Sequence, residues 1–151
     1  MKSKLCNGGI IAEIPEDFLP NEKCGRYPYG NRPPVIMSNE ELGMDITFNY
    51  LRKPLSQNSL EAAIKSVILL LEGSGSVRKV SGYHFFQGTN VKGVWIDFVS
   101  RGIYSDSHNY LAVFPIHSRF AMGTISAPFN GDGREKEIFL DMIRSITDGE
   151  K

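Results

Sequence analysis

Cysteine and histidine, two residue types that often carry site chemistry, are scarce in this 151-residue chain, which holds two cysteines and three histidines. Cys6 and Cys24 are too few for a disulfide-rich scaffold, and they lack the Cys-x-x-Cys spacing of a zinc or redox site. We expect two reduced thiols, with a disulfide between them as the alternative. The spacing of His84, His108 and His117 does not supply three metal ligands, so we expect no metal site and no cofactor.

An excess of charge of either sign is also absent. The chain has 17 Lys and Arg against 17 Asp and Glu, so its formal net charge is zero. Proteins that bind nucleic acids neutralise phosphates with a basic surface, and the count therefore argues against a nucleic-acid partner. The 41% hydrophobic residues are typical of a folded domain, and a chain of this length buries one core, so we expect a single domain over residues 1–151.

No hydrophobic run is long enough to cross a membrane. The longest, Val67–Leu71, is far shorter than the ~20 apolar residues of a spanning helix. Asn7–Gly9 interrupts the basic N-terminus before the apolar region of a signal peptide can develop. We therefore predict a cytoplasmic protein, although a chain trimmed of its leader would look the same.

The common catalytic motifs are missing as well. The chain has no phosphate-binding glycine loop, no dinucleotide-binding glycine motif, no His-Glu-x-x-His and no Gly-x-Ser-x-Gly. The residues Asp106–His108 include the three types of a hydrolase triad, but consecutive residues rarely converge as a relay, and they favour a turn. We expect no catalytic residues.

Two helices are predicted by apolar residues at helical spacing. The first begins at Asn58, which with Glu61 forms a capping-box-like start, and ends at Gly73. The second begins with Asp132 as its cap and Glu135 at its third helical position, and it carries an apolar stripe up to Ile146.

Strands occupy most of the remaining chain. Met44–Tyr50 alternates strictly between apolar and polar residues, which predicts a strand with one face on the core. The other predicted strands are Ile10–Ile14, Val35–Met37, Val77–Ser81, Tyr83–Gln87, Val91–Arg101, Tyr110–His117 and Arg119–Ala127. Short turns join the last five, which indicates an antiparallel meander. Grouped strands with two helices predict an α+β fold, and aromatic residues at both strand parities predict that both faces of the sheet are covered.

One group of candidate ligand-binding residues lies on the predicted meander. If the hairpin turn centres near Tyr104 and Ser105, Arg101 faces His108 across the hairpin, and Asp97 lies further along the same strand as Arg101. Asp97 interrupts an apolar strand, so its carboxylate is expected to be paired with a cation or exposed to water. A ligand-facing role for this group is the alternative.

A second candidate surface lies in the irregular segment Glu16–Pro34. It combines Arg26, Tyr27, Tyr29 and Arg32, residue types that are enriched at the energetic centres of protein interfaces. We therefore predict that these four residues bind a protein partner. The alternative is that they only pin the segment to the body of the domain.

Four pieces of the chain carry a family resemblance. They are Ile10–Phe18, the loop containing Arg26–Pro28 and Asn31–Pro34, the strand and helix from Met44 to Leu71, and the closing helix Phe139–Ile146. This layout resembles the PsbP-like fold, shared by the PsbP subunit of photosystem II, the Ran-binding import factor Mog, DcrB-like lipoproteins and type VI secretion effector chaperones. The resemblance implies a single antiparallel sheet between helices, an α/β/α sandwich without catalytic residues that serves as a binding or adaptor module.

The sequence therefore favours a non-enzymatic binding or adaptor domain with a protein partner. The alternative is a small-ligand-binding protein or an enzyme that uses the open sheet face around Asp97, Arg101 and His108. A third hypothesis is a homodimer formed through an exposed sheet edge.

Overall fold

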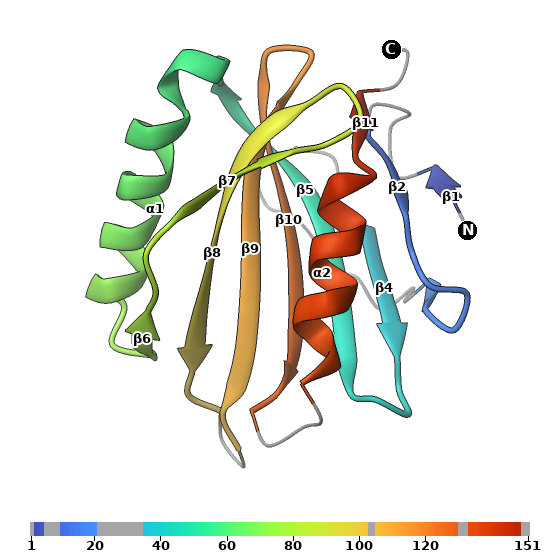
Figure 1. Ribbon diagram of the computed structural model, residues 1–151. Coiled ribbons are helices and arrows are strands. Elements are labelled where there is room, and N and C mark those ends of the chain that lie inside the picture. The colour runs from blue at the N-terminus through green and yellow to red at the C-terminus, as the bar shows by residue number, and fades with distance from the viewer. Residues whose placement is uncertain (1, 5–9, 21–34, 103–104, 130–132, 149–151) are drawn as a thin grey trace.

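A computed structural model describes residues 2–4, 10–20, 35–102, 105–129 and 133–148 (Figure 1). Within these residues the strands are β1 (Lys2–Lys4), β2 (Ile10–Glu13), β3 (Leu19–Pro20), β4 (Val35–Asn39), β5 (Met44–Pro54), β6 (Val77–Val80), β7 (His84–Gln87), β8 (Lys92–Ser100), β9 (Ser107–Ile116), β10 (Arg119–Pro128) and β11 (Thr147–Asp148). The helices are a 3₁₀ turn (Gln57–Ser59), α1 (Leu60–Gly73) and α2 (Arg134–Arg144). The two main helices and the strands around them lie where the sequence pattern predicts them.

The main sheet has eight strands, and all of its pairings are antiparallel. Its order is β3-β4-β5-β10-β9-β8-β6, and β7 also pairs with β8. The predicted meander is confirmed in β8, β9 and β10, which follow one another through the centre of the sheet. The α+β class is confirmed.

The expectation of a single sheet is wrong. The strand β2 does not join the main sheet but pairs with β1 and β11 in a separate three-stranded sheet. The pattern of β2 showed only that one of its faces is apolar, and such a face packs equally well in either sheet. Figure 1 shows this small sheet next to α2.

Each face of the main sheet is covered by its own helix. On one face Phe48, Phe114 and the helix residue Phe139 belong to one buried cluster. On the other face Leu111 and Ile64 of α1 belong to a second cluster. Alternate residues of the same strand point to opposite faces, so the sheet separates the two clusters into a three-layer arrangement.

The start of α1 differs from the prediction. A 3₁₀ turn precedes the helix, and the backbone amide of Ser56 donates to Ser59 Oγ over 3.2 Å. The helix itself begins at Leu60. The cap is therefore built from two serines, and Asn58 is an exposed residue of the 3₁₀ turn.

The start of α2 also differs from the prediction. The residue before the helix is Gly133, with a φ of +83° that glycine adopts without strain. Asp132 lies outside the described residues. Glu135 is the second residue of the helix, and its side chain is buried against the sheet instead of reaching back to the cap. No helix in the described ranges is long and apolar enough to cross a membrane.

Candidate functional site

The β8–β9 hairpin brings two of the three predicted ligand residues together. His108 is opposite Val99, and Asp97 is opposite Tyr110. The predicted pairing of Arg101 with His108 is wrong by two residues. A two-residue shift keeps every side chain on its own face, so Asp97 and His108 become diagonal neighbours on the α2 side of the sheet.

Arg101 does not take part in this arrangement. It lies beyond the end of β8 with an exposed side chain, and its backbone amide donates to the carbonyl oxygen of Ser76 over 2.7 Å. The strand β8 ends at Ser100, which lies opposite Ser107 at the start of β9, so Arg101 lies outside the β8–β9 pairing. The position of Arg101 therefore removes it from the candidate site.

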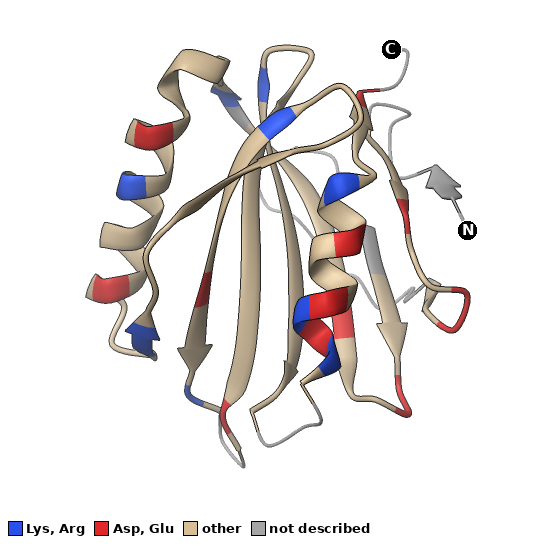
Figure 2. Cartoon of the chain, in the orientation of Figure 1, with Lys and Arg blue, Asp and Glu red and all other residues tan. Residues whose placement is uncertain are grey.

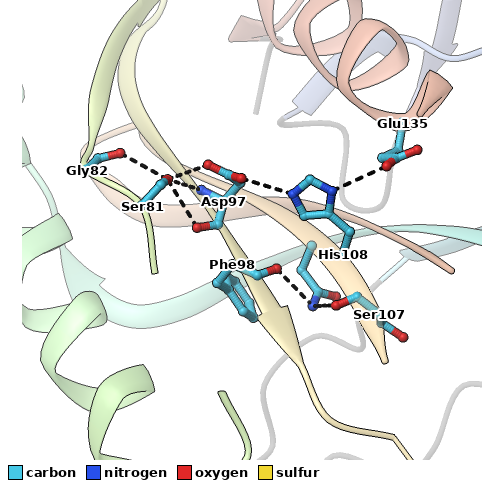
Figure 3. A network of polar contacts seen from close by, with 8 residues as sticks. Ser81, Gly82, Asp97, Phe98, Ser107, His108 and Glu135 are labelled. Carbon is cyan, nitrogen blue, oxygen red and sulfur yellow. Dashed lines mark hydrogen bonds and ion pairs between the residues drawn. The ribbon is translucent and has the colours of Figure 1, made fainter. Parts of the chain in front are cut away.

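The imidazole of His108 lies between two carboxylates (Figure 3). Its Nε2 is 2.9 Å from Asp97 Oδ2, and its Nδ1 is 3.3 Å from Glu135 Oε1. The side chains of Asp97 and His108 are 29% and 23% exposed, whereas that of Glu135 is only 6% exposed. His108 thus connects the partly open face of β8 to the buried first turn of α2.

Ser81 fixes the carboxylate of Asp97 from the opposite side. Its hydroxyl donates to Asp97 Oδ1, and its backbone amide donates to the carbonyl oxygen of Asp97 over 2.9 Å. The backbone amide of Asp97 in turn donates to Ser81 Oγ over 3.2 Å. The orientation of Asp97 is therefore set by groups from two other segments of the chain, the residue after β6 and the strand β9.

The charges at the site follow from these contacts. Burial alone would raise the pKa of Asp97, but the hydrogen bonds from Ser81 and His108 and the positive charges of His108 and Lys136 outweigh it and lower the pKa. Burial, together with the charges of Asp97 and Glu135, raises the pKa of Tyr110 to about 12. At neutral pH the carboxyl group of Asp97 is ionised and the hydroxyl of Tyr110 keeps its proton.

Both ring nitrogens of His108 contact a carboxylate oxygen. A neutral imidazole has one N–H donor and cannot donate to two carboxylates at once. Glu135 Oε2 is buried and has no hydrogen-bond partner among the described residues, and it lies in the first turn of α2, where the helix dipole stabilises a negative charge.

Asp97 and His108 line a pocket of about 330 Å³. Its other lining residues are Arg78, Lys79, Ser81, Phe98, Val99 and Phe129. Arg78 forms an ion pair with Asp106, and its guanidinium lies 6.0 Å from the centre of the Phe129 ring. Figure 2 shows basic residues on β6, and this strand pairs with β8, which carries Asp97. The pocket therefore has an acidic position on the sheet, a basic rim and apolar walls.

A row of neighbouring rings, tilted against one another, leads from the candidate site across the sheet. His108 and Tyr110 have ring centres 4.7 Å apart, Tyr110 and Trp95 6.0 Å, and Trp95 and His84 4.6 Å. Phe139 of α2 lies 5.3 Å from Tyr110 and covers this row. Trp95 is the only tryptophan of the chain, so its fluorescence reports on this part of the molecule.

The arrangement does not match a metal site or a hydrolase triad. No group of three or more potential ligands within the described ranges could hold a metal ion, and both nitrogens of His108 already face carboxylates. In a triad the serine contacts the histidine, whereas Ser81 contacts Asp97. The three consecutive residues Asp106–His108 point to different partners, since Asp106 pairs with Arg78 and His108 with Asp97.

Two contributors to the site were missed from the sequence. Glu135 lies four residues before Phe139 and seven before Met142, and this spacing places it on the apolar stripe of α2. The helical spacing could have identified it as buried. Ser81 carries no such signal, because its position depends on how the segment after β6 turns toward β8.

Several predicted residues lie outside the part of the chain that the structure describes. These are the partner-binding residues Arg26, Tyr27, Tyr29 and Arg32, and the cysteines Cys6 and Cys24. Of the other two histidines, His84 stacks on Trp95, and His117 Nε2 lies 3.0 Å from Asp148 Oδ1.

Comparisons with known proteins give a likeness in fold. No protein-family model and no curated protein sequence matches the chain. A crystal structure of a protein from Bacteroides thetaiotaomicron VPI-5482 is similar, with a TM-score of 0.64 and 9% sequence identity. The similarity covers 99% of this chain and 48% of that protein, so this chain spans about half of its length. At this identity the likeness shows the architecture alone.

Proposed function

We propose that this chain is a non-enzymatic binding domain that recognises a cationic group of a partner molecule in the pocket beside Asp97. The observation that supports this most strongly is a carboxylate held ionised at the wall of a 330 Å³ pocket by Ser81 and His108. The PsbP-like resemblance, with its binding and adaptor members, agrees with this role. We place the domain in the cytoplasm, as the sequence predicts.

The same contacts argue against catalysis at this site. A general base needs a free lone pair directed at the substrate, and a carboxylate with a lowered pKa, such as Asp97, is a weak base for activating the hydroxyl that donates to it. Both nitrogens of His108 face carboxylates, and the hydroxyl of Ser81 is bonded to Asp97. These groups fix one another in place, which suits recognition better than proton transfer.

The size of the pocket limits the ligand. Ligand sites commonly measure about 300–1,000 Å³, so this pocket is at the lower end. A single side chain or a small metabolite fits, whereas a dinucleotide does not. Its apolar walls, including Val99 and Phe129, suit the aliphatic stem of a lysine or arginine side chain, whose charged end would meet Asp97.

The ion pairs around the pocket favour a cation over an anion. Arg78 is already neutralised by Asp106, while Asp97 and the buried Glu135 share a single imidazole between them. An ammonium or guanidinium group would form a charge-assisted hydrogen bond to Asp97.

A fluorescence titration tests this proposal. We expect arginine amide and N-acetyl-lysine amide to change the emission of Trp95 saturably, and we expect Asp97→Asn to weaken binding about tenfold or more. Asp45→Asn is a matched control, because Asp45 is also a strand carboxylate that accepts a hydrogen bond from a serine, Ser38, over 2.6 Å. Equal affinity of the wild type and Asp97→Asn, or tighter binding of acetate than of the amines, would contradict the proposal.

A second candidate surface for a protein partner is the predicted set Arg26, Tyr27, Tyr29 and Arg32. Its support is the residue composition alone. A pull-down with wild type, the double variant Tyr29→Ala/Arg32→Ala and Asp97→Asn separates the two surfaces. Loss of partners only in the double variant would assign recognition to the loop, and loss only in Asp97→Asn would assign it to the pocket.

A further inference from the structure

The outer face of α1 is unusually apolar for a helix on the surface of a domain. Of its 14 residues only Leu60 and Ile64 are buried. Leu69 and Leu70 are 71% and 75% exposed, the highest values among the exposed large hydrophobic residues of the described chain. A surface helix normally turns polar residues outward, so these two leucines require an explanation.

Small residues accompany the exposed leucines along the helix. Ala62, Ser66, Leu69 and Gly73 follow one another at spacings of four, three and four, so they form one exposed line along α1. In Figure 2 this helix carries few charged positions. Small side chains let a second helix approach closely, and Leu69 projects from the same line.

An apolar groove of about 310 Å³ runs beside this line. It separates α1 from β5 and β10, and its lining includes Lys53, Pro54, Leu55 and Phe120 from the sheet side and Ala63 from the helix. Leu70 stands at the C-terminal end of the groove. A protruding leucine and a groove that fits a leucine therefore lie on the same helix.

The opposite flank of α1 carries all of its charges. They are Glu61, Lys65 and Glu72, and Lys65 Nζ lies 2.9 Å from Glu61 Oε1. If a second α1 packs antiparallel, with Ser66 of one copy opposite Leu70 of the other, the same register places Lys65 opposite Glu72 to within one residue. Two-fold symmetry repeats this pairing, so opposite charges meet twice.

We propose that two copies of this chain associate through antiparallel α1 helices, with Leu70 of each copy inserted into the groove of the other. The apolar line and the two Lys65–Glu72 pairs make the surface complementary to itself, which is the requirement of a two-fold interface. Vesicle binding needs a basic flank, and this flank carries a single lysine between two glutamates.

The edge strands β3 and β6 of the main sheet are less suited to self-association than α1. One edge strand, β3, has only two residues and ends in Pro20, which has no amide to donate. The strand β6 at the other edge carries Arg78 and Lys79, and charged residues on an edge oppose strand pairing. The dimer proposed here therefore uses α1 and leaves the pocket beside Asp97 on the opposite face.

Sedimentation equilibrium over a concentration series tests the dimer. We expect the wild type to reach the dimer mass, and Leu69→Glu and Leu70→Glu each to weaken association about tenfold or more, because a charge enters an apolar contact twice per dimer. Leu19→Glu is the matched control, since Leu19 is 66% exposed on β3 and lies away from α1. Far-UV circular dichroism of every variant confirms that the fold is retained.

Charge reversal tests the register. We expect Glu72→Lys to weaken the dimer roughly three- to tenfold and the double variant Lys65→Glu/Glu72→Lys to restore it, because the exchanged pair re-forms between copies. A wild type that stays monomeric at about 1 mM would overturn the proposal. So would a dimer that resists Leu70→Glu, or vesicle binding by a monomer that Leu70→Glu abolishes.

Discussion

The two helices of this domain cover the two faces of one sheet but are attached to it very differently. In α2 four of 11 residues are buried, and Phe139, Met142 and Ile143 enter the larger core cluster. In α1 two of 14 residues are buried, and two leucines are exposed. The helix α2 therefore supports the site from the core, whereas the outer face of α1 is the apolar surface that the proposed dimer would cover.

The largest expected effect distinguishes the apolar residues of the two helices. Phe139 is fully buried and contacts the rings of Trp95 and Tyr110, so Phe139→Ala should lower the free energy of unfolding by about 3–5 kcal/mol. Leu69→Ala should change it by less than about 0.5 kcal/mol, because the side chain is already exposed. Urea denaturation of both variants measures the contrast, and similar costs would show that the two helices are equally attached.

The next largest loss of stability is expected when the contact between His108 and Glu135, which joins the sheet to α2, is removed. His108→Ala leaves the buried carboxylate of Glu135 without its partner, which should cost about 1–3 kcal/mol of the free energy of unfolding. The double variant His108→Ala/Glu135→Leu should recover most of this cost, because the buried acceptor is removed as well. If the double variant is less stable than His108→Ala, Glu135 is stabilised by something other than this histidine.

A smaller change in stability is expected at acidic pH. The pKa of Asp97 in the folded state lies below its ordinary value near 3.8, so the unfolded state binds more protons as the pH falls. The contribution of Asp97 to stability is therefore present above about pH 4 and is lost as the pH falls through its folded pKa. Asp97→Asn should show a shallower loss of stability in this range, and Ser81→Ala should lose stability at a higher pH than wild type. Denaturant midpoints measured between pH 2 and 6 check both variants. The same dependence of the midpoint on pH in the wild type and the two variants would contradict the assigned contacts.

The smallest effect belongs to the ion pair on α1. Lys65 and Glu61 are both largely exposed, and an exposed pair at this spacing contributes little in salt. Lys65→Ala should therefore leave the unfolding midpoint of the monomer unchanged within error, in contrast to His108→Ala. A clear loss of stability in dilute protein would mean that the charged flank of α1 supports the fold itself.

The sequence predicts most of the elements because their apolar periods are explicit. Met44–Tyr50 alternates over its whole length, and the apolar residues of both helices recur every three or four positions. What could not be predicted depends on pairing between distant segments. Tertiary packing decides which strands pair with β2, and it also sets the two-residue shift of the β8–β9 hairpin. The local sequence pattern does not encode either choice.

The candidate site was predictable in part for the same reason. Asp97 was identified because it interrupts an apolar strand, and His108 because the predicted turn places it opposite Arg101. Arg101 was included by a register that places the turn too late, and Ser81 has no local signal. Glu135 was assigned to a helix cap because it follows Asp132 by three positions, although its spacing from Phe139 indicates the buried side.

The central claim is that the two faces of the sheet serve different contacts, with the pocket beside Asp97 accepting a cationic group. Amide chemical-shift mapping of the ¹⁵N-labelled protein during addition of arginine amide tests it most directly. The account predicts saturable shifts at Ser81, Asp97 and His108, with none along α1, and their loss in Asp97→Asn. Shifts confined to α1 and its groove, or unchanged shifts in Asp97→Asn, would contradict it.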